Sequence, residues 1–231
     1  MLVFIFPFLL SFDKKVSFFR RWPALIPSYL VVGTAYVGWD VYATHEGHWG
    51  FNEDHLIGIH FLGLPLEEIL FFFTVPYACL FTYEVIRAYT NQWKVPYRPA
   101  PYVFLSAVSW GVAFIFIDQG YTFLVMLSLA LLAFVMPFFR PRLLMSSYYW
   151  IYFLVTMGLF VMVNMVLTAV PVVTYGEEAI WGGDGLFNDR FFTIPLEDII
   201  YNITLLSFYL FVYDLFRKRW KISRRRDHEE W

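Results

Sequence analysis

The chain has 231 residues, of which 59% are hydrophobic, 23% aromatic and 16% charged. Soluble domains carry a charged share of about 25%, so this chain has too little polar surface to cover a water-soluble globule. Its net charge of −2 and its lone cysteine, Cys79, exclude a nucleic-acid-binding protein, a disordered chain and a disulfide scaffold. The composition instead fits a protein embedded in a membrane.

Apolar runs along the chain predict the transmembrane helices. The first run, 1–12, is too short to cross a hydrocarbon core about 30 Å thick at about 1.5 Å per residue. It is expected to be either an interfacial segment or the end of a first span. Six longer runs follow: 24–44, 66–89, 102–117, 121–139, 148–168 and 192–216. The sequence therefore predicts an all-α polytopic bundle with six clear spans and a partial seventh at the N-terminus.

Charged residues in the connections predict the orientation. Lys and Arg gather in one set of connections: 14–21, 87–98, 140–142 and 217–226. The intervening connections are mainly acidic: 46–54, 118 and 177–189. Because positive residues are retained on the cytoplasmic side, we expect a multi-pass protein of the cell inner membrane with a cytoplasmic C-terminus.

Two segments of the chain resemble each other. Residues 61–87 read FLGLPLEEILFFFTVPYACLFTYEVIR, and residues 191–217, 130 positions later, read FFTIPLEDIIYNITLLSFYLFVYDLFR. Both are expected to cross the membrane in the same direction, as parallel repeats do. The predicted organisation is a first unit at 1–100, a linking transmembrane helix at 101–120, and a second unit at 121–231 that ends in a basic tail.

Each copy opens with Pro-Leu-Glu-acid, which places Glu67 and Glu68 in one first turn and Glu197 and Asp198 in the other. Ordinary helix starts also combine proline with acids. Repetition at matched positions with apolar flanks favours a catalytic role. Desolvation and mutual repulsion favour the neutral form of a carboxylic acid, which makes a general acid available.

Other polar residues fall inside predicted spans. Asp40 is expected either to react or to support a reacting group, and Asn164 to orient a neighbour by hydrogen bonding. The acid–base pairs at i,i+3, Glu84 with Arg87 and Asp214 with Arg217, predict structural ion pairs. Four histidines lie within 16 residues at 45–60, but the second copy has none, so neither a metal nor a cofactor is predicted.

These motifs resemble those of the integral-membrane lycopene cyclases of carotenoid biosynthesis, in which two homologous units occur as separate subunits or fused in one chain. The resemblance rests on the doubled PLEE and PLED motifs, on GWD around Asp40, on GHWGFN at 47–52, and on NMVLTAVPVV at 164–173. It covers about 11–217 and implies the fused form. The chain departs from the pattern in its incomplete first span, and some relatives hydrate carotenoid ends instead.

The resemblance implies a redox-neutral isomerisation of the linear ψ end groups of lycopene and γ-carotene, taken from the bilayer. Glu68 or Asp198 is expected to protonate the C1=C2 double bond, the C5=C6 double bond attacks the C1 cation, and Glu67 or Glu197 accepts the proton from C6. The predicted substrate-binding residues are Trp39, Phe71, Phe72, Asn164, Tyr201 and Asn202. Aromatic faces stabilise a cation without acting as nucleophiles.

Other functions stay open at this point: a carotenoid hydratase, a Mg-dependent prenyltransferase, and a carotenoid-binding or transport protein. Prenyltransferases carry acids one helical turn apart with bases for diphosphate, whereas these acids are adjacent and the nearest outer base is Arg190. Parallel repeats with polar groups at membrane depth are equally expected of a transporter. The expected partners are the carotenoid and membrane lipid, and a homo-oligomer also stays open.

Overall fold

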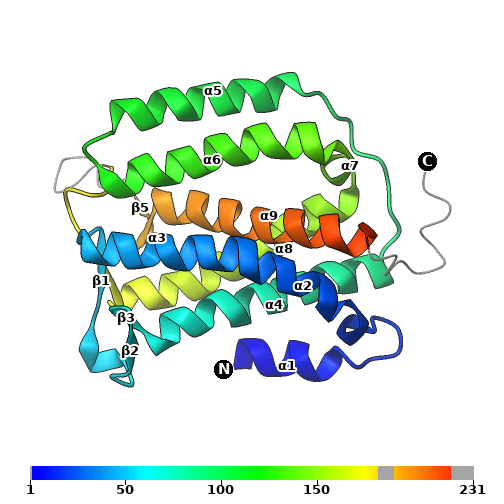
Figure 1. The fold of residues 1–231 in the computed structure, drawn as a ribbon, viewed down its shortest axis with the longest axis horizontal. Coiled ribbons are helices and arrows are strands. Elements are labelled where there is room, and N and C mark those ends of the chain that lie inside the picture. Colours follow the sequence, from blue (N-terminus) through cyan, green and yellow to red (C-terminus); the bar gives the residue numbers. More distant parts are fainter. Residues whose placement is uncertain (1, 182–189, 220–231) are drawn as a thin grey trace.

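The computed structural model describes residues 2–181 and 190–219, and most of them lie in helices that run side by side as a bundle (Figure 1). The basic residues at 221–226 and the acidic positions 184 and 189 lie outside the described residues. The first part of the chain forms α1 (Leu2–Leu10), η1 (Phe18–Arg21), α2 (Trp22–Ser28), η2 (Tyr29–Gly33), α3 (Thr34–His45), β1 (Trp49–Phe51), η3 (Glu53–His55), β2 (His60–Phe61), β3 (Leu64–Pro65) and α4 (Leu66–Tyr89). The second part forms α5 (Ala100–Ile115), α6 (Gly120–Phe139), α7 (Pro141–Leu144), α8 (Ser147–Ala169), β4 (Val173–Tyr175), β5 (Arg190–Phe191), β6 (Ile194–Pro195) and α9 (Leu196–Arg219).

Five helices in the described part of the chain are long and apolar enough to cross a membrane. They are Phe18–His45, Leu66–Tyr89, Gly120–Phe139, Ser147–Ala169 and Leu196–Arg217. The predicted span at 102–117 corresponds to α5, which is a shorter apolar helix. The run at 1–12 contains α1, which has only nine residues. The prediction of an all-α helical membrane bundle is confirmed.

The first long helix changes its winding midway. Pro27 lies inside α2 and supplies no backbone N–H, and the one-turn π-helix η2 follows directly. The turn ends at Gly33, where a Cβ atom would lie 2.8 Å from the hydroxyl of Tyr209 on α9. Glycine at this position therefore lets the first long helix and α9 approach closely.

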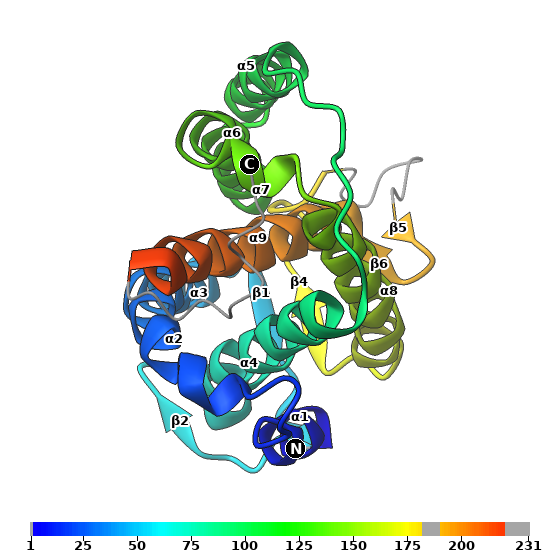
Figure 2. The ribbon, with the colours of Figure 1, turned by 90° about the vertical axis from the view of Figure 1, so that its right-hand side faces the viewer.

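Helix α9 holds the bundle together. It packs against α2, η2, α6 and α8, and α4 packs against α1 and α8. Figure 2 shows α5 and α6 set apart at one side, with α9 between them and α4. In the first half of the chain, α2 precedes α4, and in the second half, α8 precedes α9. Each of the two earlier helices packs on the last helix of the other half: α2 on α9, and α8 on α4.

The segments around the two acid pairs have the same local structure. Each is a two-residue hairpin followed by a helix of 24 residues, β2–β3–α4 in one case and β5–β6–α9 in the other. The bounds of corresponding elements lie 130 positions apart. Even the tight turns match, since Leu62 and Phe192 have positive φ angles of 55° and 58°.

The last span begins later than predicted. The run from Phe192 was expected to be helical, but residues 190–195 form the hairpin in which Phe191 pairs with Ile194. The left-handed backbone at Phe192 cannot continue a right-handed helix. Pro195 then pairs with Arg190, and the helix begins at Leu196.

An antiparallel ribbon joins the two halves at the end where the acid pairs lie. Strand β1, after α3, pairs with β4, after α8, with Gly50 opposite Thr174. The ends of α3 and α8 lie 124 positions apart, and so do Gly50 and Thr174. Asp40 and Asn164 share this separation, so they occupy corresponding places in the two halves.

Candidate active site

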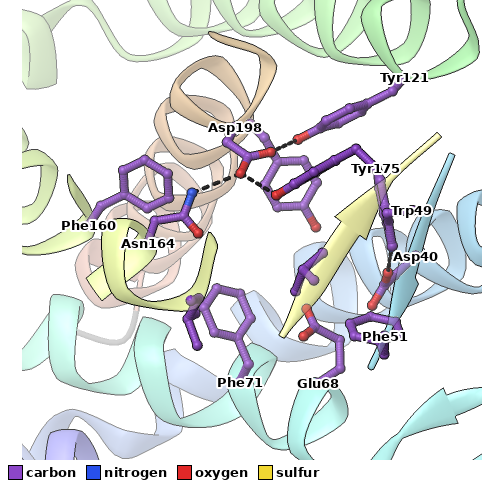
Figure 3. A pocket seen from close by; sticks show the side chains of 13 residues that line it. Asp40, Trp49, Phe51, Glu68, Phe71, Tyr121, Phe160, Asn164, Tyr175 and Asp198 are labelled. Carbon is purple, nitrogen blue, oxygen red and sulfur yellow. Dashed lines mark hydrogen bonds between the residues drawn. The ribbon is translucent and has the colours of Figure 1, made fainter. Parts of the chain in front are cut away.

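A pocket opens where the ribbon, α3, α4, α6, α8 and α9 meet (Figure 3). Its lining residues are Asp40, Trp49, Phe51, Glu68, Phe71, Tyr121, Phe160, Asn164, Leu167, Val173, Tyr175, Asp198 and Tyr201. Three of these carry carboxyl groups and none carries a basic side chain. The pocket therefore brings together acids from both halves of the chain in surroundings that are otherwise apolar, aromatic or neutral.

Asp198 is the most strongly hydrogen-bonded of the three acids. It lies in the first turn of α9 and is buried. Tyr121 donates to its Oδ1 at 2.7 Å, while Tyr175 and Asn164 donate to its Oδ2 at 2.5 and 2.8 Å. Figure 3 shows these three donors converging on the carboxyl group from α6, β4 and α8. Asn164 thus has the hydrogen bond to a neighbouring side chain that its predicted orienting role requires.

Asp40 and Glu68 have fewer partners. Asp40 is buried, and the indole nitrogen of Trp49 donates to its Oδ1 at 2.7 Å. Its Oδ2 atom has no hydrogen-bond partner among the described residues. Glu68, in the first turn of α4, faces the pocket on the same side as Asp40 and across from Asp198 (Figure 3). Among the described residues, no positively charged side chain forms an ion pair with Glu68.

Glu67 and Glu197 point away from the pocket and hold connecting segments in place. The backbone N–H of Ile57 donates to Glu67 Oε1 at 2.7 Å, and the backbone N–H of Trp181 donates to Glu197 Oε1 at the same distance. Thr122 also donates to Glu197, at 2.6 Å. Adjacent residues on a helix point about 100° apart, so each acid pair sends one carboxyl group into the pocket and one to a connection.

Some of the other predicted substrate-binding residues line the pocket and some do not. Phe71 and Tyr201 line the pocket. Trp39 does not line the pocket but packs against Tyr201, with the two ring centroids 5.0 Å apart. Phe72 and Asn202 are buried and do not line the pocket. Of the predicted aromatic residues, the structure therefore places two in the wall of the pocket.

Sequence reasoning missed several residues of the site, above all Tyr121, Tyr175 and Trp49. The sequence contains one signal for Tyr175, which is its position relative to the repeat. Tyr175 lies 124 positions after Phe51, and Asn164 lies the same number of positions after Asp40. The acid pairs lie 130 positions apart. The connection in the second half is thus six residues longer, and a comparison at one fixed offset does not align Tyr175 with Phe51.

The last turns of α4 and α9 hold a second acidic cluster, with the opposite environment. Glu84 forms ion pairs with Arg21, Arg87 and Arg217, and it accepts a hydrogen bond of 2.9 Å from Tyr213. Asp214 pairs with Arg217 at 3.5 Å and with Arg140 at 3.9 Å. Both predicted i,i+3 pairs are present, and they join into one buried network that links four helical segments.

The four histidines at 45–60 lie outside the pocket, in the connection between α3 and α4 and at its borders. His48 is buried, and burial lowers its pKa, while the nearby Glu46 partly opposes this shift. His45 and His55 are exposed. Across residues 2–181 and 190–219, no group of three or more His, Cys, Asp or Glu side chains is arranged to hold a metal ion.

Comparison with known proteins identifies the family of the chain. The model of the lycopene cyclase family matches residues 1–86 and 118–216, which is most of the chain and includes every residue that lines the pocket. The unmatched stretch contains α5 and the connection that leads into it. No curated protein and no solved structure matches the chain. The chain belongs to the lycopene cyclase family, whose members are enzymes of carotenoid biosynthesis that act on a carotenoid substrate.

Proposed function

We propose that this protein closes β-ionone rings at the ψ ends of lycopene, and that the reaction takes place in the pocket between its two halves. The observation that carries the proposal is the meeting of Asp40, Glu68 and Asp198 in a pocket without a basic side chain among its lining residues. Such a site offers a neutral carboxylic acid within apolar walls, which is what protonation of a carbon–carbon double bond requires.

The reaction begins with a proton from Glu68. Its carboxyl group faces the same pocket as those of Asp40 and Asp198. Ionised carboxyl groups repel one another and lose hydration in apolar surroundings, so the group with the fewest hydrogen-bond donors keeps its proton. Glu68 donates this proton to C2 of the C1=C2 double bond, which leaves a tertiary cation at C1.

Ring closure and proton loss complete the reaction. The C5=C6 double bond attacks C1, which forms the C1–C6 bond and moves the positive charge to C5. Loss of the proton from C6 to a carboxylate then forms the C5=C6 double bond of the β-ring. One proton enters and one leaves, so the product is an isomer of the substrate and no electrons are exchanged.

The aromatic wall suits a cationic intermediate. Phe71, Tyr201 and Trp49 line the pocket, and the negative face of an aromatic ring attracts a cation without bonding to it. Water captured by the cation would give a hydroxyl group instead of a ring. A wall of aromatic and aliphatic side chains therefore favours cyclisation over hydration.

The matched segments support an internal parallel repeat, with α5 as the helix that links the two units. The 130-position spacing of the hairpins and of the helices that follow them is the main support. The alternation of basic and acidic connections favours a cytoplasmic C-terminus in the inner membrane. The acid pocket then lies toward the opposite face of the membrane, near the first turns of α4 and α9.

The direct test is expression in a bacterial host that accumulates lycopene, followed by chromatography of the pigments. The proposal predicts γ-carotene, β-carotene or both. Unchanged lycopene with the protein present in the membrane would contradict it. A hydroxyl group at C1 would identify a hydratase, dependence on a divalent cation a prenyltransferase, and carotenoid binding without a new product a carrier.

A further inference from the structure

The three pocket acids are unequal in their hydrogen bonds. Asp198 accepts bonds from two tyrosine hydroxyl groups and one amide, at 2.5–2.8 Å. Asp40 accepts one bond, from Trp49. Donors aimed at a carboxyl group stabilise its ionised form. Of the three acids, Asp198 is therefore the one best prepared to carry a negative charge.

A charge on Asp198 also affects the other two acids. All three line one pocket, and no basic side chain lines it with them. A second negative charge there would face the first in a medium where charges interact strongly. The carboxyl groups of Glu68 and Asp40 consequently keep their protons, and the first half of the chain supplies the acid.

We infer that the two halves divide the chemistry: Glu68 donates the proton, and Asp198, held by Tyr121 and Tyr175, is the carboxylate that faces the cation and accepts the proton from C6. Tyr121 and Tyr175 are positioning residues in this scheme. The inference rests on the cyclase function proposed above and assigns the roles within it. It excludes Asp198 as the proton donor, although the sequence favours Glu68 and Asp198 equally.

The step balances without a further reactant. The O–H bond of Glu68 breaks and a C2–H bond forms. Later the C6–H bond breaks and an O–H bond forms on Asp198. Each turnover therefore moves one proton from Glu68 to Asp198 through the substrate. Loss of this proton from Asp198 to water and uptake of a solvent proton by Glu68 restore the resting enzyme.

The ribbon between the two halves fixes the tyrosines. Tyr175 lies in β4 opposite Trp49 of β1. Its ring stacks on that of Tyr121 at a centroid distance of 6.2 Å and an angle of 10°, and Tyr121 packs edge-on against Trp49 at 4.8 Å. The same Trp49 donates to Asp40. One aromatic stack thus orients carboxyl groups that come from both halves of the chain.

The experiment uses membranes that contain the full chain, supplied with unlabelled lycopene in deuterium oxide. Asp198→Asn is expected to lower β-ring formation at least 100-fold while the recovered lycopene still gains deuterium at its end groups. Protonation by Glu68 persists in this variant, and the cation decays by returning a proton from C2 to Glu68. Glu68→Gln is expected to lose both the rings and the label.

Tyrosine variants test the positioning role with a smaller change. Tyr175→Phe keeps the ring and removes one hydrogen bond to a charged group, so ring formation is expected to fall about 10- to 100-fold in kcat, with KM changed less than threefold and the label in lycopene retained. Tyr149→Phe is the matched control. It removes a buried hydroxyl group of α8 that bonds Ser207 on α9, the helix that carries Asp198, at 3.1 Å and away from the pocket. Both readouts should stay at the wild-type level.

The outcomes separate this inference from the proposed function. Wild-type membranes that form no rings would overturn the cyclase proposal itself. With active wild-type membranes, an Asp198→Asn protein that is present at the normal level but incorporates no deuterium would overturn the division of roles. So would a Glu68→Gln protein that still labels lycopene, or an Asp198→Asn protein that keeps more than a tenth of the ring formation.

Discussion

The two ends of α4 and α9 carry the same kinds of acid in opposite surroundings. In the first turns, Glu68 and Asp198 face a pocket with tyrosine, amide and aromatic neighbours. In the last turns, Glu84 and Asp214 lie among Arg21, Arg87, Arg140 and Arg217. Both sets of acids are placed by the same pair of helices.

The difference shows what each end contributes. A carboxylate surrounded by guanidinium groups is held ionised and cannot act as an acid, so the arginine-rich end stabilises the fold. Carboxyl groups without a cation nearby are costly inside a membrane protein, and those with few hydrogen-bond donors retain their protons. In the proposed function, the pocket end carries the chemistry at the expense of stability, and the variants below separate the two contributions.

The largest effect is expected for Glu68→Gln, which keeps the size of the side chain and removes the proton donor. The rate of ring formation should fall by about 10²- to 10⁴-fold, the usual contribution of a general acid. Rates are measured by chromatography and normalised to the amount of protein in the membrane. Glu67→Gln is the matched control, since its side chain accepts a bond from Ile57 outside the pocket, and it should lose far less activity.

Glu84→Gln tests the other end. It removes the charge that pairs with Arg21 and Arg217 and leaves buried guanidinium groups with a neutral partner. Removal of one partner of a buried ion pair costs about 3–5 kcal/mol, which should appear as a lower free energy of unfolding in detergent–lipid micelles. Ring formation per folded molecule should be unchanged. A variant as stable as the wild type would show that the network contributes little.

Asp40→Asn makes the first half resemble the second, where Asn164 donates to Asp198. An amide beside Glu68 supplies a donor and removes a neighbouring carboxyl group, and both changes favour ionisation of Glu68. The rate of ring formation in isolated membranes should fall about tenfold, which corresponds to about 1.4 kcal/mol. A rate at or above that of the wild type would mean that Asp40 does not influence the donor.

The smallest effect is expected for Arg140→Gln. Its side chain is 21% exposed and its Nη1 atom lies 3.9 Å from Asp214 Oδ2, whereas Arg217 reaches the same carboxylate from a fully buried position. A partly exposed, long ion pair contributes less than about 1 kcal/mol. The free energy of unfolding should therefore change by no more than this amount. A loss comparable to that of Glu84→Gln would place Arg140 at the centre of the network.

The sequence predicts the spans and the acids more completely than it predicts the site around them. Hydropathy locates a helix at each of the six predicted spans, five of them long enough to cross a membrane, because a run of apolar residues needs no knowledge of its neighbours. It misplaces the start of α9 by four residues, since the hairpin at 190–195 is as apolar as the helix. Repetition identifies Glu68 and Asp198, but not which member of each acid pair faces the pocket.

The rest of the site depends on tertiary packing. Tyr121 and Tyr175 lie 77 and 23 residues from Asp198, the acid that they contact. Their role follows from the pairing of β1 with β4 and from the contact between α6 and α9. No local pattern indicates these long-range contacts. Glu67 and Glu197 look equivalent to Glu68 and Asp198 in the sequence, and only the paths of the connecting segments separate them.

The central claim is that a carboxylic acid of this pocket protonates the end group of the carotenoid. The most direct measurement is the deuterium content of β-rings formed from unlabelled lycopene by wild-type membranes in deuterium oxide. The account predicts one deuterium atom per ring, at C2, because Glu68 exchanges its proton with solvent before it reacts. Rings that form at the normal rate without deuterium at C2 would contradict it.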